Sequence, residues 1–399
     1  MPTCVILSVM PTIRKTFLRA TLTMTGTIIG AGIFGVPAVI TEAGIVTGSI
    51  LFWITWLVIL ATHLLYLELI LLRESALKMG KSHSKRHRLP GYVSASLGPW
   101  AKYVTAAIQS LQLIGASFAY LIIGGEFVGF LLTRFGVVAG ETLFQVVFWL
   151  IGALAILLAL RAMSKIESVL TWALLFVLTV LVVGAGFQAD STRFVAANWE
   201  LAFMPIGVFL FSLFGMTIIP EVFEITGRRP ARTRHAVILG SFTAALFTWL
   251  FGIFVSSAVP AGVAPDRAAM VDLLPGGLWW VLPLVGLFAV LTSFITSAFG
   301  LKMMYRIELK QPRIIARLVA LGAPLALLFL VPTDFLVALD VVGVFFTGGN
   351  ALLVVLAAYV AMHHAKERRP FWWRTAAPIL AASFFAIVIF DRLLGILGS

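Results

Sequence analysis

The sequence predicts an all-α polytopic membrane protein, because it is strongly apolar and its apolar residues fall into helix-length segments. Hydrophobic residues make up 61% of the 399 positions, charged residues make up 12%, and the mean hydropathy is +1.05. A membrane-spanning helix needs about 20 apolar residues, and about eleven segments meet that length. We expect one transmembrane domain over residues 1–396. The segments are roughly 17–41, 44–72, 100–132, 142–160, 166–187, 201–224, 237–259, 278–304, 314–331, 335–362 and 375–396.

The positive charges predict how the segments are oriented. Loops rich in lysine and arginine remain in the cytoplasm. With a cytoplasmic N-terminus, only Arg134, Arg193, Arg267 and Arg392 of the 29 basic residues fall outside. We therefore expect a multi-pass protein of the plasma or inner membrane, with the C-terminus outside. The net charge of +12 is spread over alternate loops, whereas a nucleic-acid-binding protein gathers its charge on one face.

The first segment is interrupted by glycines. Residues 26–37 read GTIIGAGIFGVP, with four glycines and a proline. In a bilayer an interrupted helix survives only where protein or a polar cavity pairs the freed backbone groups, so the interruption predicts a binding site. Residues 30–35 also fit a dinucleotide-binding pattern, but no strand precedes them. Close helix packing through Gly26 and Gly30 is the remaining alternative.

A second interruption predicts an internal repeat. The sixth segment contains Ser212, Gly215 and Pro220, and five spans separate it from the first interruption. An odd number of spans per repeat inverts the second copy, which is the plan of many secondary transporters. The repeats would cover about 17–187 and 201–362, with an extra helix at 375–396.

Interrupted helices suit a zwitterionic ligand, because half-helix N-termini attract an anion and half-helix C-termini attract a cation. We expect a carboxylate at the N–H groups of Ala31, Gly32 and Ile33, and an ammonium group near the carbonyls of Ile28, Phe209 and Ser212. Nearby aromatic residues would form an apolar pocket, although each of them could equally pack against lipid. The predicted substrate residues are Gly30, Ala31, Gly32, Ile33, Tyr120, Phe209, Phe211, Ser212, Leu213 and Gly215.

Four segments resemble the amino acid permeases of the amino acid–polyamine–organocation (APC) superfamily, in the prokaryotic branch near the hydroxy/aromatic amino acid and amino acid/auxin permeases. This resemblance implies a LeuT-like fold of 5+5 inverted repeats with broken helices 1 and 6. It also implies symport of a neutral, large or aromatic amino acid. The four segments are GTIIGAGIFGVP at 26–37, LPGY at 89–92 leading into GASFAYLIIGGE at 115–126, FSLFGMTIIPE at 211–221 and LTSF at 291–294.

The resemblance also implies a sodium site. In sodium-coupled relatives one cation bridges span 1 carbonyls and a Thr-Ser pair on span 8, which correspond here to Gly26, Ile29, Thr292 and Ser293. The alternative is that both hydroxyls bond their own helix. Where some relatives place an asparagine for a second sodium this chain has Ile33, and residues 170–176 lack the lysine of other relatives. No cofactor is expected beyond a coupling Na⁺ or H⁺.

Acidic residues within the spans are the candidates for proton transfer or gating, because charges at such depth are costly. Glu126 lies late in span 3 and Glu221 late in span 6. These observations together predict a secondary active amino acid transporter. A membrane sensor without flux and a transporter of another small organic amine remain alternatives, and the oligomeric state stays open. No metal cluster or catalytic dyad suggests an enzyme.

Overall fold

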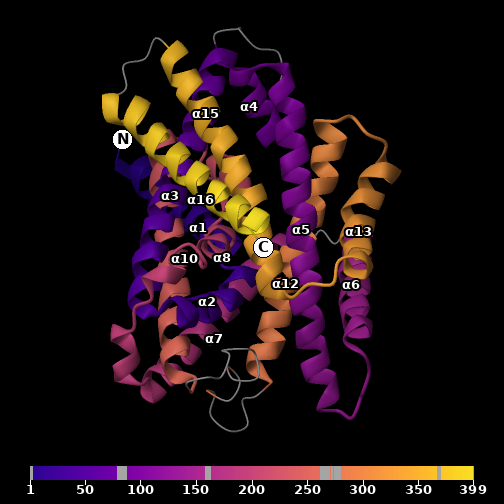
Figure 1. Ribbon diagram of the computed structural model, residues 1–399. Coiled ribbons are helices and arrows are strands. Elements are labelled where there is room, and N and C mark those ends of the chain that lie inside the picture. Colours follow the sequence, from indigo (N-terminus) through magenta and orange to yellow (C-terminus); the bar gives the residue numbers. More distant parts are fainter. Residues whose placement is uncertain are drawn as a thin grey trace.

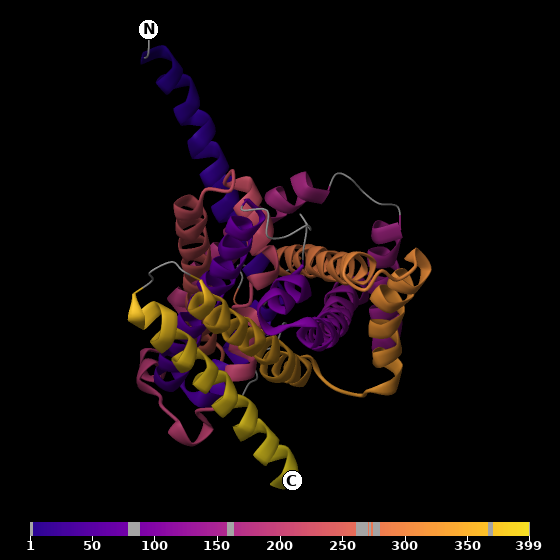
Figure 2. The ribbon, with the colours of Figure 1, turned by 90° about the horizontal axis from the view of Figure 1, so that it is seen from above.

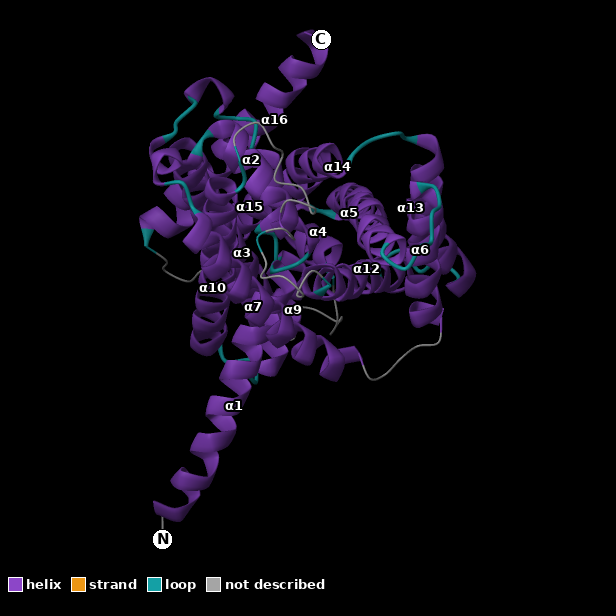
Figure 3. Cartoon of the chain, turned by 90° about the horizontal axis from the view of Figure 1, so that it is seen from below, coloured by secondary structure: helices purple, strands orange, loops and turns teal. Residues whose placement is uncertain are grey.

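The computed structural model describes residues 3–78, 88–157, 163–260, 270, 273, 280–365 and 370–398. Over these residues the chain consists of helices and loops without a β-strand, as Figure 3 shows. The longer helices in chain order are α1 (Thr3–Ile28), α2 (Val36–Ala43), α3 (Ile45–Lys78), α4 (Leu89–Leu97), α5 (Pro99–Thr133), α6 (Glu141–Leu157), α7 (Met163–Gln188), α8 (Ile206–Ser212), α9 (Ile219–Ile225), α10 (Pro230–Ala258), α12 (Val281–Ile307), α13 (Arg313–Leu330), α14 (Phe335–Val341), α15 (Gly348–His364) and α16 (Ala377–Gly398).

Eight described stretches are long and apolar enough to cross a membrane, and α1 with the bent segment after it makes a ninth. The eight are α3, α5, α8 with α9, α10, α12, α13, α14 with α15, and α16. Two shorter apolar helices, Glu141–Leu157 and Trp172–Gln188, fall on the remaining predicted spans. The protein is therefore a polytopic helical membrane protein, and eleven crossings stay a prediction.

Helix α5 is the central helix of the bundle, and 83% of its most apolar stretch of 18 residues is buried. It packs along α12 and α6, and α6 and α13 stand side by side at one edge of the bundle (Figures 1 and 2). Glycines make the approach of α6 possible: a Cβ on Gly125 would lie 2.7 Å from the Cα of Gln145. Small residues at helix interfaces are how membrane helices maximise packing.

The two ends of the chain project from opposite sides of the bundle in Figure 2. Several helices begin with a proline in their first turn, a position where the missing N–H costs nothing. Among them are α2 with Pro37 and α9 with Pro220, the two helices that follow the interruptions. In both interrupted spans the second half-helix therefore begins with a proline in its first turn, and glycines lie in the break that precedes it.

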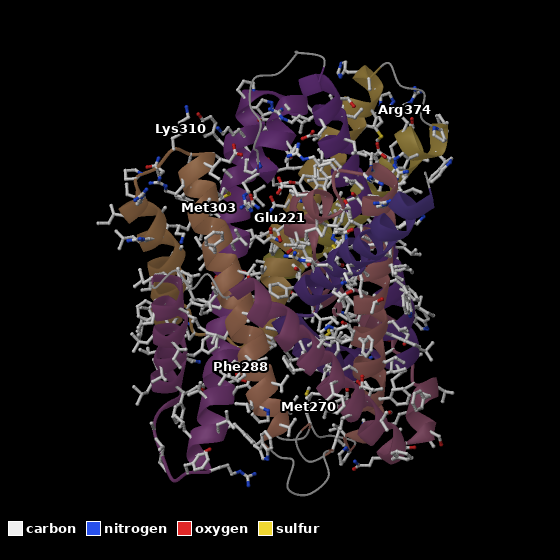
Figure 4. The ribbon with its side chains drawn as sticks, turned by 180° about the vertical axis from the view of Figure 1, so that it is seen from behind. Glu221, Met270, Phe288, Met303, Lys310 and Arg374 are labelled. Atoms are coloured by element: carbon white, nitrogen blue, oxygen red, sulfur yellow. The ribbon has the colours of Figure 1, made fainter. Side chains whose placement is uncertain are left out.

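Ion pairs gather at one end of the molecule, the end that carries Lys310 and Arg374 in Figure 4, while Met270 lies toward the other end. The basic partners there belong to loops and helix ends predicted to be cytoplasmic. Of the four basic residues predicted to lie outside, Arg267 falls outside the described residues. The pairs at this end are Arg88–Glu221 (3.3 Å), Lys102–Glu308 (3.7 Å), Arg228–Glu74 (3.3 Å), Arg228–Glu224 (3.7 Å) and Arg234–Glu68 (2.6 Å).

Candidate substrate and cation site

The first span is interrupted after Ile28. The N–H of Gly30 bonds the carbonyl of Ile28 at 2.8 Å, and a short 3-10 helix η1 (Ala31–Gly35) leads into α2. The two halves meet at an angle of 46°. The first N–H groups of any helix lack partners within that helix, so η1 begins with backbone donors in the middle of the bundle.

The second interruption lies between α8 and α9. Helix α8 ends at Ser212, the chain turns through Gly215, and the 3-10 helix η4 (Met216–Ile218) leads into α9. This break is a change of hydrogen bonding within one apolar stretch, and it bends the span less than the first break does.

The two interruptions touch each other through Gly32 and Ser212. The Ser212 hydroxyl donates to the Gly32 carbonyl at 2.8 Å, across 180 residues of sequence. A Cβ on Gly32 would lie 2.7 Å from Ser212 Oγ and 2.8 Å from Ser212 Cα, so only glycine fits. The space that a side chain at position 32 would need is therefore filled by α8, and a carboxylate at the N–H groups of Ala31, Gly32 and Ile33 stays a prediction.

A buried histidine completes the hydrogen bonding of the second interruption. His63 on α3 is 1% exposed, and its Nε2 accepts a hydrogen bond from the N–H of Gly215 at 3.1 Å. A neutral His63 therefore carries its proton on Nδ1. His63 falls within the predicted segment 44–72, and its partner, 152 residues away, cannot be identified from the sequence.

A cavity of about 210 Å³ lies beside the two interruptions. All four residues of the predicted cation site line it: Gly26, Ile29, Thr292 and Ser293. The hydroxyls of Thr292 and Ser293 each donate to the carbonyl of Ala289 at 2.9 Å. A hydroxyl that donates its proton still has lone pairs, so both oxygens can also face a cation.

Two of the ten predicted substrate residues line the cavity, and the other eight do not. Tyr120 and Phe211 line the cavity, and their ring centroids are 6.1 Å apart. Phe209 is fully buried and packs edge-on against Phe52, with ring centroids 5.2 Å apart. The remaining seven lie at the interruptions and are not among the described residues that line the cavity; they are Gly30, Ala31, Gly32, Ile33, Ser212, Leu213 and Gly215.

Three polar residues that sequence reasoning missed also line the cavity: Gln109, Gln112 and Thr347. Gln109 and Gln112 share a face of α5 with Ala116 and Tyr120, which also line it. Their spacing of three, four and four residues is the helical pattern of one face, and this signal was available in the sequence. Thr347 ends a π-helical turn, η5 (Val342–Thr347), and such turns are frequent at functional sites.

A second cavity of about 250 Å³ continues the first toward the end that carries the ion pairs. Arg88, Pro220 and Glu221 line both cavities, so the ion pair of Arg88 with Glu221 lies where they join. Figure 4 shows Glu221 and Met303, which both line the second cavity, in the half of the molecule that carries Lys310. Glu126 lines neither of these two described cavities.

Tyr92 on the short helix α4 also lines the second cavity. Burial raises the pKa of the Tyr92 hydroxyl above its usual value, and the nearby carboxylate of Glu74 adds to the shift. The phenol is therefore neutral at physiological pH. It contributes a hydrogen-bonding group to the cavity mouth without adding a charge.

Two interrupted helices and a partly polar cavity beside them define a membrane protein with a ligand site within its helical bundle. The sequence pattern of the tryptophan/tyrosine permease family matches residues 13–262, and the chain belongs to that family. It is accordingly an amino acid permease of the aromatic type and not an enzyme. The match includes both interruptions and α5 but ends before Thr292 and Ser293. No individual curated protein matches the chain significantly.

Proposed function

We propose that the protein is a secondary active transporter that imports an aromatic amino acid through alternating access of two inverted repeats. The observation that carries the proposal is the cavity beside both interruptions, lined by the rings of Tyr120 and Phe211 and by the hydroxyls of Thr292 and Ser293. Apolar walls with a few polar groups are typical of sites for organic ligands. The aromatic rings suit an aromatic side chain, and the family assignment agrees with that choice.

A LeuT-like 5+5 arrangement, and with it a place in the APC superfamily, accounts for the helix pairing. If α8 with α9 starts a second copy of the first five spans, α3 corresponds to α10, α5 to α12 and α6 to α13. Each of these pairs is in contact. Pro37 and Pro220 also occupy equivalent positions at the start of the second half-helix. These features support the inverted repeat.

Sodium is the proposed coupling ion. Gly26, Ile29, Thr292 and Ser293 all line the cavity. In this proposal the first two offer backbone carbonyls to the ion and the last two offer hydroxyls. Small hard cations prefer oxygen ligands of this kind. Coupling to protons is the competing possibility, with Glu126 or Glu221 as the carrier. In this proposal Glu221 could also gate the cavity, and its ion pair with Arg88 supports that role.

Uptake into proteoliposomes tests the proposal. Purified protein should accumulate labelled tryptophan or tyrosine against a gradient when sodium or protons are supplied outside, and unlabelled aromatic amino acids should compete. Small organic amines that lack a carboxylate should not compete with this uptake. Binding of tryptophan without any uptake would instead favour the sensor, and uptake of amines alone would favour an amine transporter.

A further inference from the structure

A cluster of carboxamide side chains joins α5 to the π-helical turn and α15 at the cavity wall. Gln112 Nε2 donates to Thr347 Oγ1 at 2.9 Å, and Gln112 Oε1 accepts from Asn350 Nδ2 at 2.7 Å. Gln112 and Asn350 are buried within this cluster. The carboxamide of Gln112 is thus held at both of its atoms and is not free to turn toward a ligand.

Gln109 lies one turn before Gln112 on the same face of α5, and it has a different environment. It lines the cavity, and it is 6% exposed. Its Oε1 has no hydrogen-bond partner among the described residues. A buried acceptor without a donor is costly, and in native proteins such groups are usually satisfied by water or by a ligand. The amide group of Gln112 donates to Thr347 and is not the donor for Gln109.

We propose that Gln109 determines substrate specificity by accepting a hydrogen bond from the side chain of the bound amino acid, either the indole N–H of tryptophan or the phenol O–H of tyrosine. This inference rests on the proposed function and adds a residue that distinguishes among aromatic substrates. Gln109 lies in the same cavity wall as Leu113 and Ala116, which offer apolar surface to the ring. Phenylalanine fits the same apolar surface and has no donor.

The physical consequence is a preference that depends on one atom of the substrate. A site built to bond an N–H or O–H group discriminates against the analogue that lacks it, because the acceptor is then left buried and unpaired. We expect tyrosine to be favoured over phenylalanine, and tryptophan over 1-methyltryptophan, by about tenfold in kcat/KM, the ratio expected from one net hydrogen bond.

The test compares four substrates in proteoliposomes containing the full-length protein. Labelled tryptophan, 1-methyltryptophan, tyrosine and phenylalanine are offered to the wild type, to Gln109→Met and to Gln188→Met. Methionine has nearly the length of glutamine but no strong acceptor. Gln188→Met makes the same substitution at an exposed position on α7 that lines neither described cavity, and it serves as the matched control. The methyl group of 1-methyltryptophan could reduce uptake by its size alone. Comparing tyrosine with phenylalanine avoids this steric effect, because phenylalanine is the smaller of the two.

The proposal expects both substrate ratios to fall to within about twofold of one in Gln109→Met, with phenylalanine uptake preserved. It expects them to remain near the wild-type value in Gln188→Met. Equal use of all four substrates by the wild type would overturn it, as would a uniform loss for all four in Gln109→Met. Should Gln109→Met not fold, wild-type ratios near one would still overturn the proposal. If the wild type transports none of the four substrates, the proposed function itself is overturned.

Discussion

At the scale of single residues, the contact between Gly32 and Ser212 fixes how the two interrupted helices meet. The serine hydroxyl bonds the glycine carbonyl at 2.8 Å, and the serine backbone lies where a side chain at position 32 would be. The interruption at Gly32 is therefore required by packing between two distant parts of the chain, whatever ligand is bound.

Gly32→Ala should lower both the melting temperature and the transport rate, because overpacking of this kind costs about 1–3 kcal/mol. Gly322 is the matched control, since a Cβ there meets nothing within 4 Å and alanine favours its helix, α13. Thermal unfolding of the purified variants measures the difference. Equal melting temperatures for Gly32→Ala and Gly322→Ala would contradict the packing argument.

Thr292 and Ser293 are the residues that separate sodium from proton coupling. Replacing both with alanine removes two hydroxyl oxygens from the cavity wall while leaving the backbone of α12 helical. Sodium stimulation of uptake should then be lost, and Thr243→Ala, which removes an exposed hydroxyl bonded to its own helix, should retain it. Uptake that ignores sodium in the wild type and loses its pH dependence in Glu126→Gln would instead establish protons as the coupling ion.

At the scale of elements, the unwound segment between α8 and α9 depends on a partner from another helix. Gly215 donates its N–H to His63 on α3, and both groups are shielded from water. Without that acceptor the N–H would be buried and unpaired, which costs about 1–3 kcal/mol. Helix α3 thus stabilises the second interruption.

His63→Leu should therefore destabilise the protein and reduce uptake, and His63→Gln, whose side-chain oxygen can accept the same hydrogen bond, should be less damaging. Melting temperatures and initial uptake rates of the two variants measure the effect. If the leucine and glutamine variants are equally stable, the hydrogen bond to Gly215 has no structural role.

The sequence revealed which elements are interrupted but not what those interruptions contact. Glycines and prolines act locally, so the breaks near Gly30 and Gly215 could be predicted from their own segments. The partners of those breaks, Ser212 for Gly32 and His63 for Gly215, lie 180 and 152 residues away, and only the packing of whole spans brings them together. The same reason hid Gln109, whose importance depends on a cavity that several helices form.

At the scale of the whole molecule, two joined cavities connect the interruptions with the end that carries the ion pairs. The basic residues at that end belong to loops predicted to be cytoplasmic. Under that prediction the two cavities would form a path from the candidate site toward the cytoplasm. The ion pair between Arg88 and Glu221 lies at the junction of the cavities. A transporter that works by alternating access needs such a path on each side in turn.

The central claim is that the cavity beside the interruptions binds the substrate, and cysteine labelling tests it directly. The chain has a single cysteine, Cys4, so Thr217→Cys in a Cys4→Ser background places one reactive thiol on the cavity wall. Ser191→Cys, on the exposed 3-10 helix η2 (Ser191–Val195), is the matched control. Saturating tryptophan should slow maleimide labelling at position 217 and leave position 191 unchanged. An unchanged rate at position 217, in protein shown to bind tryptophan, would place the substrate elsewhere and contradict the account.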